Sequence, residues 1–257
     1  MTLHVNAAVF GLLLFAIAIQ VSYAEDACPP PERFCTQRMN IANNAAFVRS
    51  YVPFLCDAKT DGGRWIIIQS RLHRDTSFNR NWTEYKNGFG TTCTDYWLGN
   101  EMIHQITSMR WELSVVVVIA LGALCSCRRS AGSSLLLSID LFASGNRYYA
   151  TYRNFKVGSE KDNYRLSLGE FFKGNADDDF RTHDNMSFST PDRDNDNSPE
   201  QFCAQLYESG WWFNKCLKVN LNGQFDTTVT GKHVIWYVLT GYTESVTSVE
   251  MKIRKMN

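Results

Sequence analysis

The sequence predicts a secreted globular domain that is built mainly from short β-strands and stabilised by disulfides. Its 257 residues are 44% hydrophobic and 20% charged, which is enough apolar material for a well-filled core. From Asp57 onward, short β-rich runs alternate with turns. Eight cysteines accompany an N-terminal export signal, and in exported proteins cysteines are used chiefly for disulfides.

The export signal is predicted over residues 1–24. An apolar stretch runs from Ala7 to Ile19, and Ser22-Tyr23-Ala24 places small residues where a signal peptidase cleaves. The stretch is shorter than the roughly 20 residues of a membrane span, so we expect cleavage before Glu25 rather than an anchor. A secreted chain with no membrane span follows from this interpretation.

Charge and aromatic content narrow the class of function. Basic and acidic residues each number 26, so the formal net charge is zero. Nucleic-acid-binding and membrane-surface proteins depend on basic patches, which disfavours both functions for this chain. Seven Trp, eleven Tyr and sixteen Phe are more than a core of this size needs, so we expect some to line a binding face.

The elements follow in chain order. Residues 25–52 form a short lead-in that contains Cys28 and Cys35. Trp65 to Gln69 is predicted to be a buried strand. Asn81 to Tyr85 is predicted to be a short helix that ends at Asn87-Gly88, with an irregular turn as the alternative.

Two N-glycosylation sequons fit an exported protein. They begin at Asn81 and Asn185, each followed two residues later by Thr or Ser. A third match, Asn197-Ser198-Pro199, fails because its third residue is Pro. We therefore expect glycosylation at Asn81 and Asn185 alone.

The segment from Ser114 to Leu136 differs from its surroundings. It contains four consecutive valines at positions 115–118, then Cys125 and Cys127, and ends in small residues. The apolar run is about half the length of a membrane span. A buried strand and an aggregation-prone exposed segment are both consistent with this composition.

The acidic loop, residues 192–200, concentrates hard oxygen donors of the kind that Ca²⁺ prefers. An EF-hand is excluded because its sixth and twelfth positions would be Asn197 and Cys203 instead of Gly and Glu. The alternative is a solvated acidic turn. The loop by itself does not decide between the two.

A possible disulfide lies directly after this loop. A bond between Cys203 and Cys216 would stabilise the fold by about 3 kcal/mol in the chain-entropy model. It would hold Trp211 and Trp212 beside the acidic loop, either as core residues or as a wall that packs on sugar rings. No zinc-protease pattern, nucleophile elbow or phosphate loop is present in the sequence, so we do not expect an enzyme.

Several of these motifs together resemble the fibrinogen-related domain, the C-terminal module of fibrinogen chains, ficolins, tachylectins, angiopoietins and tenascins. The matching segments cover most of the chain from Cys56 to Arg254. They are Thr60 to Trp65, Trp82 to Gly90, Tyr96 to His104, Asn154 to Gly158, Asp162 to Leu166, Phe188 to Thr190, Asp192 to Asn197, Gly210 to Cys216, Leu221 to Gly223 and Glu250 to Arg254.

The resemblance implies an α+β domain over residues 53–257, with a twisted, mainly antiparallel sheet and a loop-rich C-terminal lobe that binds Ca²⁺. By position, Asp194 and Asp196 match the family's carboxylate ligands, and Ser198 and Glu200 match its main-chain carbonyl ligands. It also implies a Cys203–Cys216 disulfide.

A ligand pocket beside this metal site is implied as well. Lys215-Cys216 matches an unusual cis peptide bond, Tyr207 and Tyr242 match wall tyrosines, and Trp211 completes the expected ligand-binding residues. Leu217 stands where many members have His. Leu206 and Tyr207 replace the polar and acidic residues of fibrin-type pockets, so binding of a peptide amine is not expected.

The resemblance also explains the segment at 115–136. A family strand that begins at Trp111-Glu112-Leu113 continues here only at Ser138 to Leu141, so the residues between look inserted. We hypothesise a retained intron or a gene-model error, and such an insertion would interrupt a central strand. Cys56 is expected to pair with Cys35 or Cys28, and Cys93, Cys125 and Cys127 have no family partner.

Two functions are consistent with the family. The first is a secreted, calcium-dependent lectin of innate immunity, of invertebrate type, that binds acetylated sugars or related groups on microbial surfaces. The second is a secreted protein-binding ligand or matrix component of the angiopoietin or tenascin type. A lead-in cysteine would link chains into a homo-oligomer, which strengthens binding through many weak sites.

Overall fold

The computed structural model describes residues 34–43, 46–92, 94–108, 115–118, 124–127 and 134–256. The predicted signal at residues 1–24, Cys28 and Cys93 lie outside the described residues. Within the described ranges, no helix has the length and apolar character needed to cross a bilayer.

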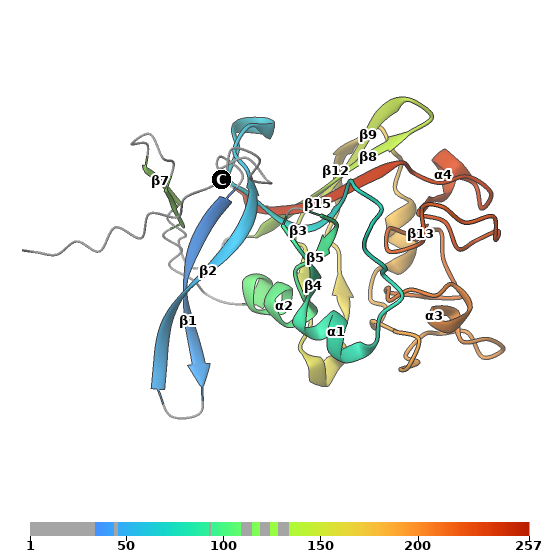
Figure 1. The fold of residues 1–257 in the computed structure, drawn as a ribbon, viewed down its shortest axis with the longest axis horizontal. Coiled ribbons are helices and arrows are strands. Elements are labelled where there is room, and N and C mark those ends of the chain that lie inside the picture. The colour runs from blue at the N-terminus through green and yellow to red at the C-terminus, as the bar shows by residue number, and fades with distance from the viewer. Residues whose placement is uncertain are drawn as a thin grey trace, which may run out of the picture.

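One antiparallel sheet of eleven strands forms the framework (Figure 1). Its longest path is β12-β9-β8-β15-β3-β2-β1-β6-β7, and β4 and β5 extend it beside β3. The strands are β1 Phe34–Asn43, β2 Ala46–Asp57, β3 Trp65–Arg71, β4 Phe89–Gly90, β5 Tyr96–Trp97, β6 Val115–Val118, β7 Leu124–Cys127, β8 Leu135–Ala143, β9 Asn146–Tyr152, β12 Phe171–Gly174 and β15 Ser248–Lys255.

Helices and two small sheets complete the described fold. The small sheets pair β10 (Lys156–Val157) with β11 (Leu166–Ser167) and β13 (Val219–Asn220) with β14 (Ile235–Trp236). The α-helices are α1 Trp82–Asn87, α2 Asn100–Ser108, α3 Cys203–Leu206 and α4 Tyr237–Thr240, and the 3-10 helices are Thr60–Gly62, Glu160–Asp162 and Asp179–His183. Short strands joined to a few helices confirm the α+β class.

The core strands are buried on both faces. In β3, every residue except Ile66 is buried, and β15 and β8 pair in antiparallel register over eight positions. Helix α2 buries Ile103 and Ile106 in the same core cluster. A strand covered on both sides reads as a continuous apolar run, which is why Trp65 to Gln69 was recognisable in the sequence. That predicted strand is confirmed as part of β3.

Helix α1 has the ends predicted for it. The Asn81 side chain accepts from the Glu84 backbone N–H at 2.9 Å, and the Glu84 carboxylate accepts from the Asn81 N–H at 3.0 Å. This reciprocal capping box satisfies two backbone donors at the helix start. Gly88, at φ 89°, ends the helix in a conformation that only glycine adopts cheaply.

The expected interruption of a central strand does not occur. β8 runs without a break from Leu135 to Ala143 between β9 and β15, so that part of the insertion hypothesis was wrong. Its first three residues, Leu135 to Leu137, are buried and pair with β15. Leu135 and Leu136, the last two residues of the predicted insertion, and Leu137 after it supply the start of the strand, while Trp111 to Leu113 lie outside the described residues.

The valine segment and the lead-in occur at the other end of the sheet. β1 and β2 form a long hairpin over most of the predicted lead-in, and this hairpin projects from the body in Figure 1. β6, with its four valines, pairs with β1, and β7 pairs with β6. The origin of residues 115–136 stays a hypothesis.

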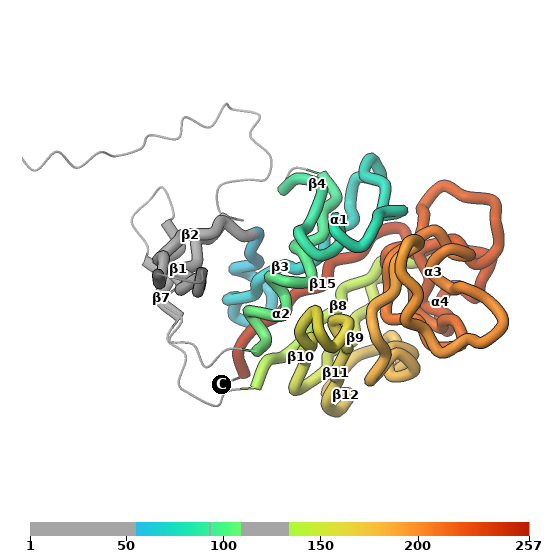
Figure 2. The backbone as a smooth tube through the Cα atoms, turned by 90° about the horizontal axis from the view of Figure 1, so that it is seen from below, coloured from blue at the N-terminus to red at the C-terminus, as the bar shows by residue number. Residues whose placement is uncertain are grey.

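The C-terminal lobe, residues 175–247, is rich in loops and occupies one end of the body, as the orange and red tube of Figure 2 shows. Its regular structure consists of short pieces: the 3-10 helix at 179–183, α3, α4 and the two-residue strands β13 and β14. Three adjacent aromatic residues, Trp211, Trp212 and Phe213, are fully buried inside it.

Candidate functional site

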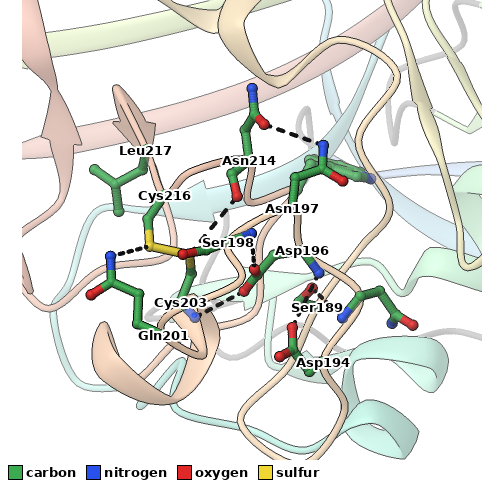
Figure 3. Close-up of a disulfide and its surroundings, with 12 residues drawn as sticks. Ser189, Asp194, Asp196, Asn197, Ser198, Gln201, Cys203, Asn214, Cys216 and Leu217 are labelled. Carbon is green, nitrogen blue, oxygen red and sulfur yellow. Dashed lines mark hydrogen bonds between the residues drawn. A yellow bond between two sulfur atoms is a disulfide. The ribbon is translucent and has the colours of Figure 1, made fainter.

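The acidic loop is folded around its own carboxylates (Figure 3). Asp194 accepts from the Asp196 N–H at 3.1 Å. One Asp196 carboxylate oxygen accepts from the Ser198 N–H and the other from the Cys203 N–H, each at 2.8 Å. Asp196 therefore joins the loop to the first residue of α3.

The donor set fits a calcium ion. Burial and the neighbouring Asp194 charge both raise the pKa of Asp196, so the two carboxylates destabilise one another when both are ionised. Neither of them forms a salt bridge to a described residue, and the Ser198 and Glu200 carbonyls accept no hydrogen bond from one. Two adjacent carboxylates and two free carbonyls are ligands that Ca²⁺ prefers.

A disulfide connects this loop to the segment beyond it. Cys203 and Cys216 are bonded, with their Cα atoms 5.5 Å apart. The peptide bond between Lys215 and Cys216 is cis, at the position that the family resemblance indicated. Cys56 is also disulfide-bonded, and its partner is not among the residues whose side chains are described, so the choice between Cys35 and Cys28 stays a prediction.

The tyrosine face, which we define as Leu206, Tyr207, Val229, Tyr237, Val238 and Tyr242, lies beyond the disulfide. Apart from the half-buried Tyr207, its members are between 39% and 50% exposed. They are five of the eight most exposed large hydrophobic residues in the described part of the chain. The contacts described below bring Tyr207, Tyr237 and Tyr242 together, and exposed apolar residues gathered in this way indicate an interaction surface rather than ordinary surface scatter.

Contacts between three loops hold the tyrosine face together. The rings of Tyr237 and Tyr242 lie 4.7 Å apart, and the Tyr242 hydroxyl donates to the Leu217 carbonyl at 3.1 Å. The Gly231 N–H donates to the Tyr242 carbonyl at 2.9 Å. A Cβ at Gly231 would come within 2.7 Å of the Tyr207 ring, so only glycine fits there. Burial raises the pKa of Tyr242, so its hydroxyl keeps the proton that it donates.

The acidic loop and the tyrosine face are thus connected through the chain of contacts just described. Asp196 holds Cys203, Cys203 is bonded to Cys216, and Leu217 accepts the hydrogen bond from Tyr242. These contacts connect the acidic loop directly to the residue that positions the Tyr242 ring. This region presents rings, amides and carboxylates, which are groups suited to binding.

One predicted ligand residue is placed elsewhere. Trp211 is fully buried between Phe180 and Trp212, with ring centroids at 5.6 and 5.2 Å, so it cannot line a surface pocket. Aromatic residues that pack edge-to-face fill a loop-rich core that regular elements leave irregular. Tyr207 and Tyr242 do reach the tyrosine face, and Lys215 is exposed.

His183 is a residue that sequence reasoning missed. It is fully buried, and its Nδ1 donates to the Trp212 carbonyl at 2.7 Å. Its Nε2 accepts from the Val219 N–H at 3.0 Å and the Lys218 N–H at 3.3 Å. Burial lowers its pKa to about 4, so it is neutral. The sequence held no signal for this role, because its three partners lie between 29 and 36 residues away.

A family model confirms the resemblance inferred from the motifs. The model for the C-terminal globular domain of fibrinogen beta and gamma chains matches residues 35–126 and 126–256. The chain belongs to the fibrinogen C-terminal domain family.

Relatives of the domain include bovine and human fibrinogen-like protein 1, each 38% identical over 219 residues. Human angiopoietin-related protein 7 is 38% identical over 205 residues. These matches cover 77% of this chain but 62% of either fibrinogen-like protein 1 and 52% of angiopoietin-related protein 7. The chain therefore spans between half and two thirds of the length of these relatives.

Solved structures give the same family. The fibrinogen-like globe domain of human ANGPTL6 superimposes with a TM-score of 0.69 at 31% identity, covering 81% of this chain and 86% of that one. The corresponding domain of human ANGPTL2 has a TM-score of 0.67, also at 31% identity, over 80% of this chain and 87% of that one. The expectation of an invertebrate lectin is not supported by these relatives, which are of the fibrinogen-like and angiopoietin-related type.

Proposed function

We propose that this fibrinogen-like domain belongs to a secreted protein ligand of the angiopoietin-related type. In this proposal the tyrosine face contacts a partner protein, and calcium bound at Asp194 and Asp196 stabilises the adjoining acidic loop. The observation that carries the proposal is the gathering of exposed apolar side chains over residues 206–242.

The composition of the face supports a protein partner. Tyr side chains supply large contact areas at low conformational-entropy cost and are enriched at protein interfaces. Tyr237 and Tyr242 pack against one another, so their positions are largely set before a partner arrives. The relatives with similar sequences support this function over a lectin.

Calcium has a supporting role in this proposal. When bound, the ion would supply positive charge between carboxylates that otherwise repel, with the Ser198 and Glu200 carbonyls as further ligands. The protein's own contribution is to hold Asp196 against the Cys203 N–H and so keep the disulfide and Leu217 in place. The partner contacts the tyrosine face and not the ion.

The test compares two exposed apolar positions. Full-length protein is screened against an array of receptor ectodomains, and the best binder is titrated against Tyr237→Ala. Truncating a central interface residue costs about 2 kcal/mol or more, a loss of affinity of about thirtyfold. The matched control is Phe172→Ala on β12, which is equally exposed but lies outside the face.

Two results would contradict the proposal. One is an equal loss of affinity in Tyr237→Ala and Phe172→Ala, and the other is the absence of any ectodomain bound. Because calcium has only a supporting role, chelation is expected to weaken the interaction without abolishing it.

Sugar binding is the second candidate, because the rings of Tyr207 and Tyr242 also offer flat faces suited to sugar rings. It predicts binding to immobilised N-acetylglucosamine that disappears completely in chelator. Retention on that resin together with no binding to ectodomains would favour this calcium-dependent lectin function and its microbial ligands.

A further inference from the structure

Two sequons are not accounted for by the proposed function, and the fold brings both to the acidic loop. Asn81 lies at the start of α1, and Asn185 follows the 3-10 helix at 179–183. They are separated by more than one hundred residues in the chain. Each is adjacent to a residue that contacts the acidic loop directly.

The first contact is at the beginning of the loop. Trp82, next to Asn81, donates its backbone N–H to the Asp192 carboxylate at 2.9 Å. The guanidinium of Arg193 also stacks over the Trp82 ring, with its central carbon 3.9 Å from the ring centroid. A group attached at Asn81 therefore leaves the surface beside the first residues of the acidic loop.

The second contact is further along the loop. Met186, next to Asn185, has its sulfur 3.0 Å from the Asn197 side-chain nitrogen. Asn197 also donates to the Asn214 side chain at 3.2 Å, which fixes it beside the disulfide loop, as Figure 3 shows. A group attached at Asn185 leaves the surface beside Asn197.

Both asparagine side chains suit attachment. Each residue is exposed, and neither Nδ2 donates a hydrogen bond to any residue in the described ranges. The capping bond of Asn81 uses its Oδ1, which a glycan on Nδ2 leaves intact. Ser187 is buried in the folded domain, but oligosaccharide transfer takes place on the nascent chain, before that burial.

We propose that N-linked glycans on Asn81 and Asn185 flank the acidic loop and shield it from other macromolecules, leaving the tyrosine face open. At each site the amide Nδ2 bonds to C1 of an oligosaccharide carried on a lipid diphosphate. The C1–oxygen bond to the diphosphate breaks, the lipid diphosphate leaves, and the amide loses one proton. The inference rests on the secretion that the proposed function requires.

The sequence of the acidic loop agrees with this arrangement. The loop has its own Asn-X-Ser triplet at Asn197, but Pro199 at the third position prevents attachment there. Glycans would thus stand on either side of the calcium ligands without occupying the loop. Small ions pass between glycan chains, whereas a protein does not.

Attachment is tested by intact mass of the full-length chain secreted from animal cells, before and after enzymatic removal of N-glycans. Thr83→Ala and Ser187→Ala are each expected to lose one glycan. They are preferable to changes of the asparagines, because Asn81 caps α1 and Asn185 has φ 63°, a conformation that Asn tolerates better than Gln. Thr83→Ser keeps the sequon and should keep its glycan.

Shielding is tested with a glutamate-specific endoproteinase, which cleaves after exposed glutamates. Glu200 lies in the acidic loop and Glu244 lies near Tyr242, and both are exposed. In the Thr83→Ala/Ser187→Ala double variant, cleavage after Glu200 should be several-fold faster than in the wild type. Cleavage after Glu244 should be unchanged, which makes it the internal control.

Absence of a glycan at either site, or failure of the chain to reach the medium, would overturn the inference. Equal acceleration at Glu200 and Glu244, or none at either, would overturn the shielding. Failure of the proposed binding through the tyrosine face can be distinguished from failure of the glycan inference, because Tyr237→Ala leaves both sequons intact.

Discussion

The sheet and the C-terminal lobe satisfy their backbone groups in different ways. β8 pairs along its length with β9 on one side and β15 on the other, so regular ladders satisfy its N–H and C=O groups. In the lobe, β13 and β14 pair at only two positions. There, buried side chains such as those of His183 and Asn222 bond to main-chain groups of distant loops instead.

This difference concentrates stability on single residues in the lobe. A ladder shares its hydrogen bonds among many residues, and the loss of one side chain leaves it in place. In the lobe, removing one buried polar side chain leaves several main-chain groups without partners, each at a cost of roughly 1–3 kcal/mol. The three changes below test this contrast.

The largest effect is expected at the join between sheet and lobe. Arg71, the last residue of β3, is buried and donates to the Leu221 and Gly223 carbonyls of the lobe. Burial lowers its pKa to about 10, so it stays charged at neutral pH. Arg71→Met should reduce the free energy of unfolding by about 3–5 kcal/mol in a urea titration.

Arg165→Met is the matched control. Arg165 pairs with Asp162 at 3.3 Å and donates to the Asn185 carbonyl at 2.6 Å, but it is 45% exposed, so water replaces these contacts and its removal should cost less than about 0.5 kcal/mol. If Arg71→Met cost no more than Arg165→Met, the join would not depend on a single buried residue.

A pH effect follows from His183. Burial holds its folded pKa at about 4, below the ordinary value of 6.5, so the unfolded chain binds a proton first as the pH falls. The stabilisation is complete above pH 6.5 and is lost as the pH approaches 4, by about 3 kcal/mol. Unfolding titrations at several pH values measure this loss.

His183→Asn removes the titrating ring and keeps one donor and one acceptor. The difference in stability between wild type and variant should shrink as the pH falls from 6.5 to 4. A difference that is constant with pH would show that His183 binds the same number of protons in the folded and unfolded chain, which would contradict the lowered pKa.

The smallest change in the metal-free protein is expected for Asp194→Asn. In chelator, this substitution removes a charge that repels Asp196 and should raise the melting temperature slightly. In calcium the sign should reverse, because the wild type gains about 2.7 kcal/mol at one hundred times its dissociation constant and the variant gains less. Differential scanning calorimetry in both buffers checks the reversal.

Equal shifts in calcium and in chelator would instead mean that the acidic loop is a solvated turn. Glu244→Gln serves as the control for charge, since Glu244 is exposed and lies outside the loop. It should behave alike in the two buffers.

Elements governed by neighbours in the chain were predictable. The two ends of α1 need only Asn81 and Glu84 at its start and Gly88 at its end, which lie within eight residues. β3 was predictable because part of its sequence is a continuous apolar run. The family was likewise evident from its motifs, and the resemblance implied the Cys203–Cys216 disulfide; both are confirmed.

Features that depend on distant partners were not predictable. Whether Trp211 lines a ligand pocket or lies in the core depends on whether Phe180 packs against it. The two residues are 31 positions apart in the chain. Either the segment at Trp111 or the segment at Leu135 could have formed the start of β8 by pairing with β15, and composition does not distinguish between the two segments. Leu135 does so, opposite Lys255.

By itself, the sequence determined the local chemistry: where helix α1 begins and ends, which loop is acidic, which cysteines are close enough to bond and where glycans can attach. The tertiary structure alone decided which aromatic residues are buried, which form the tyrosine face, and that both sequons border the acidic loop. The physical reason is the separation along the chain between the residues that interact. Caps and turns form between neighbouring residues, whereas burial and surface neighbourhood are set by residues that only the folded chain brings together.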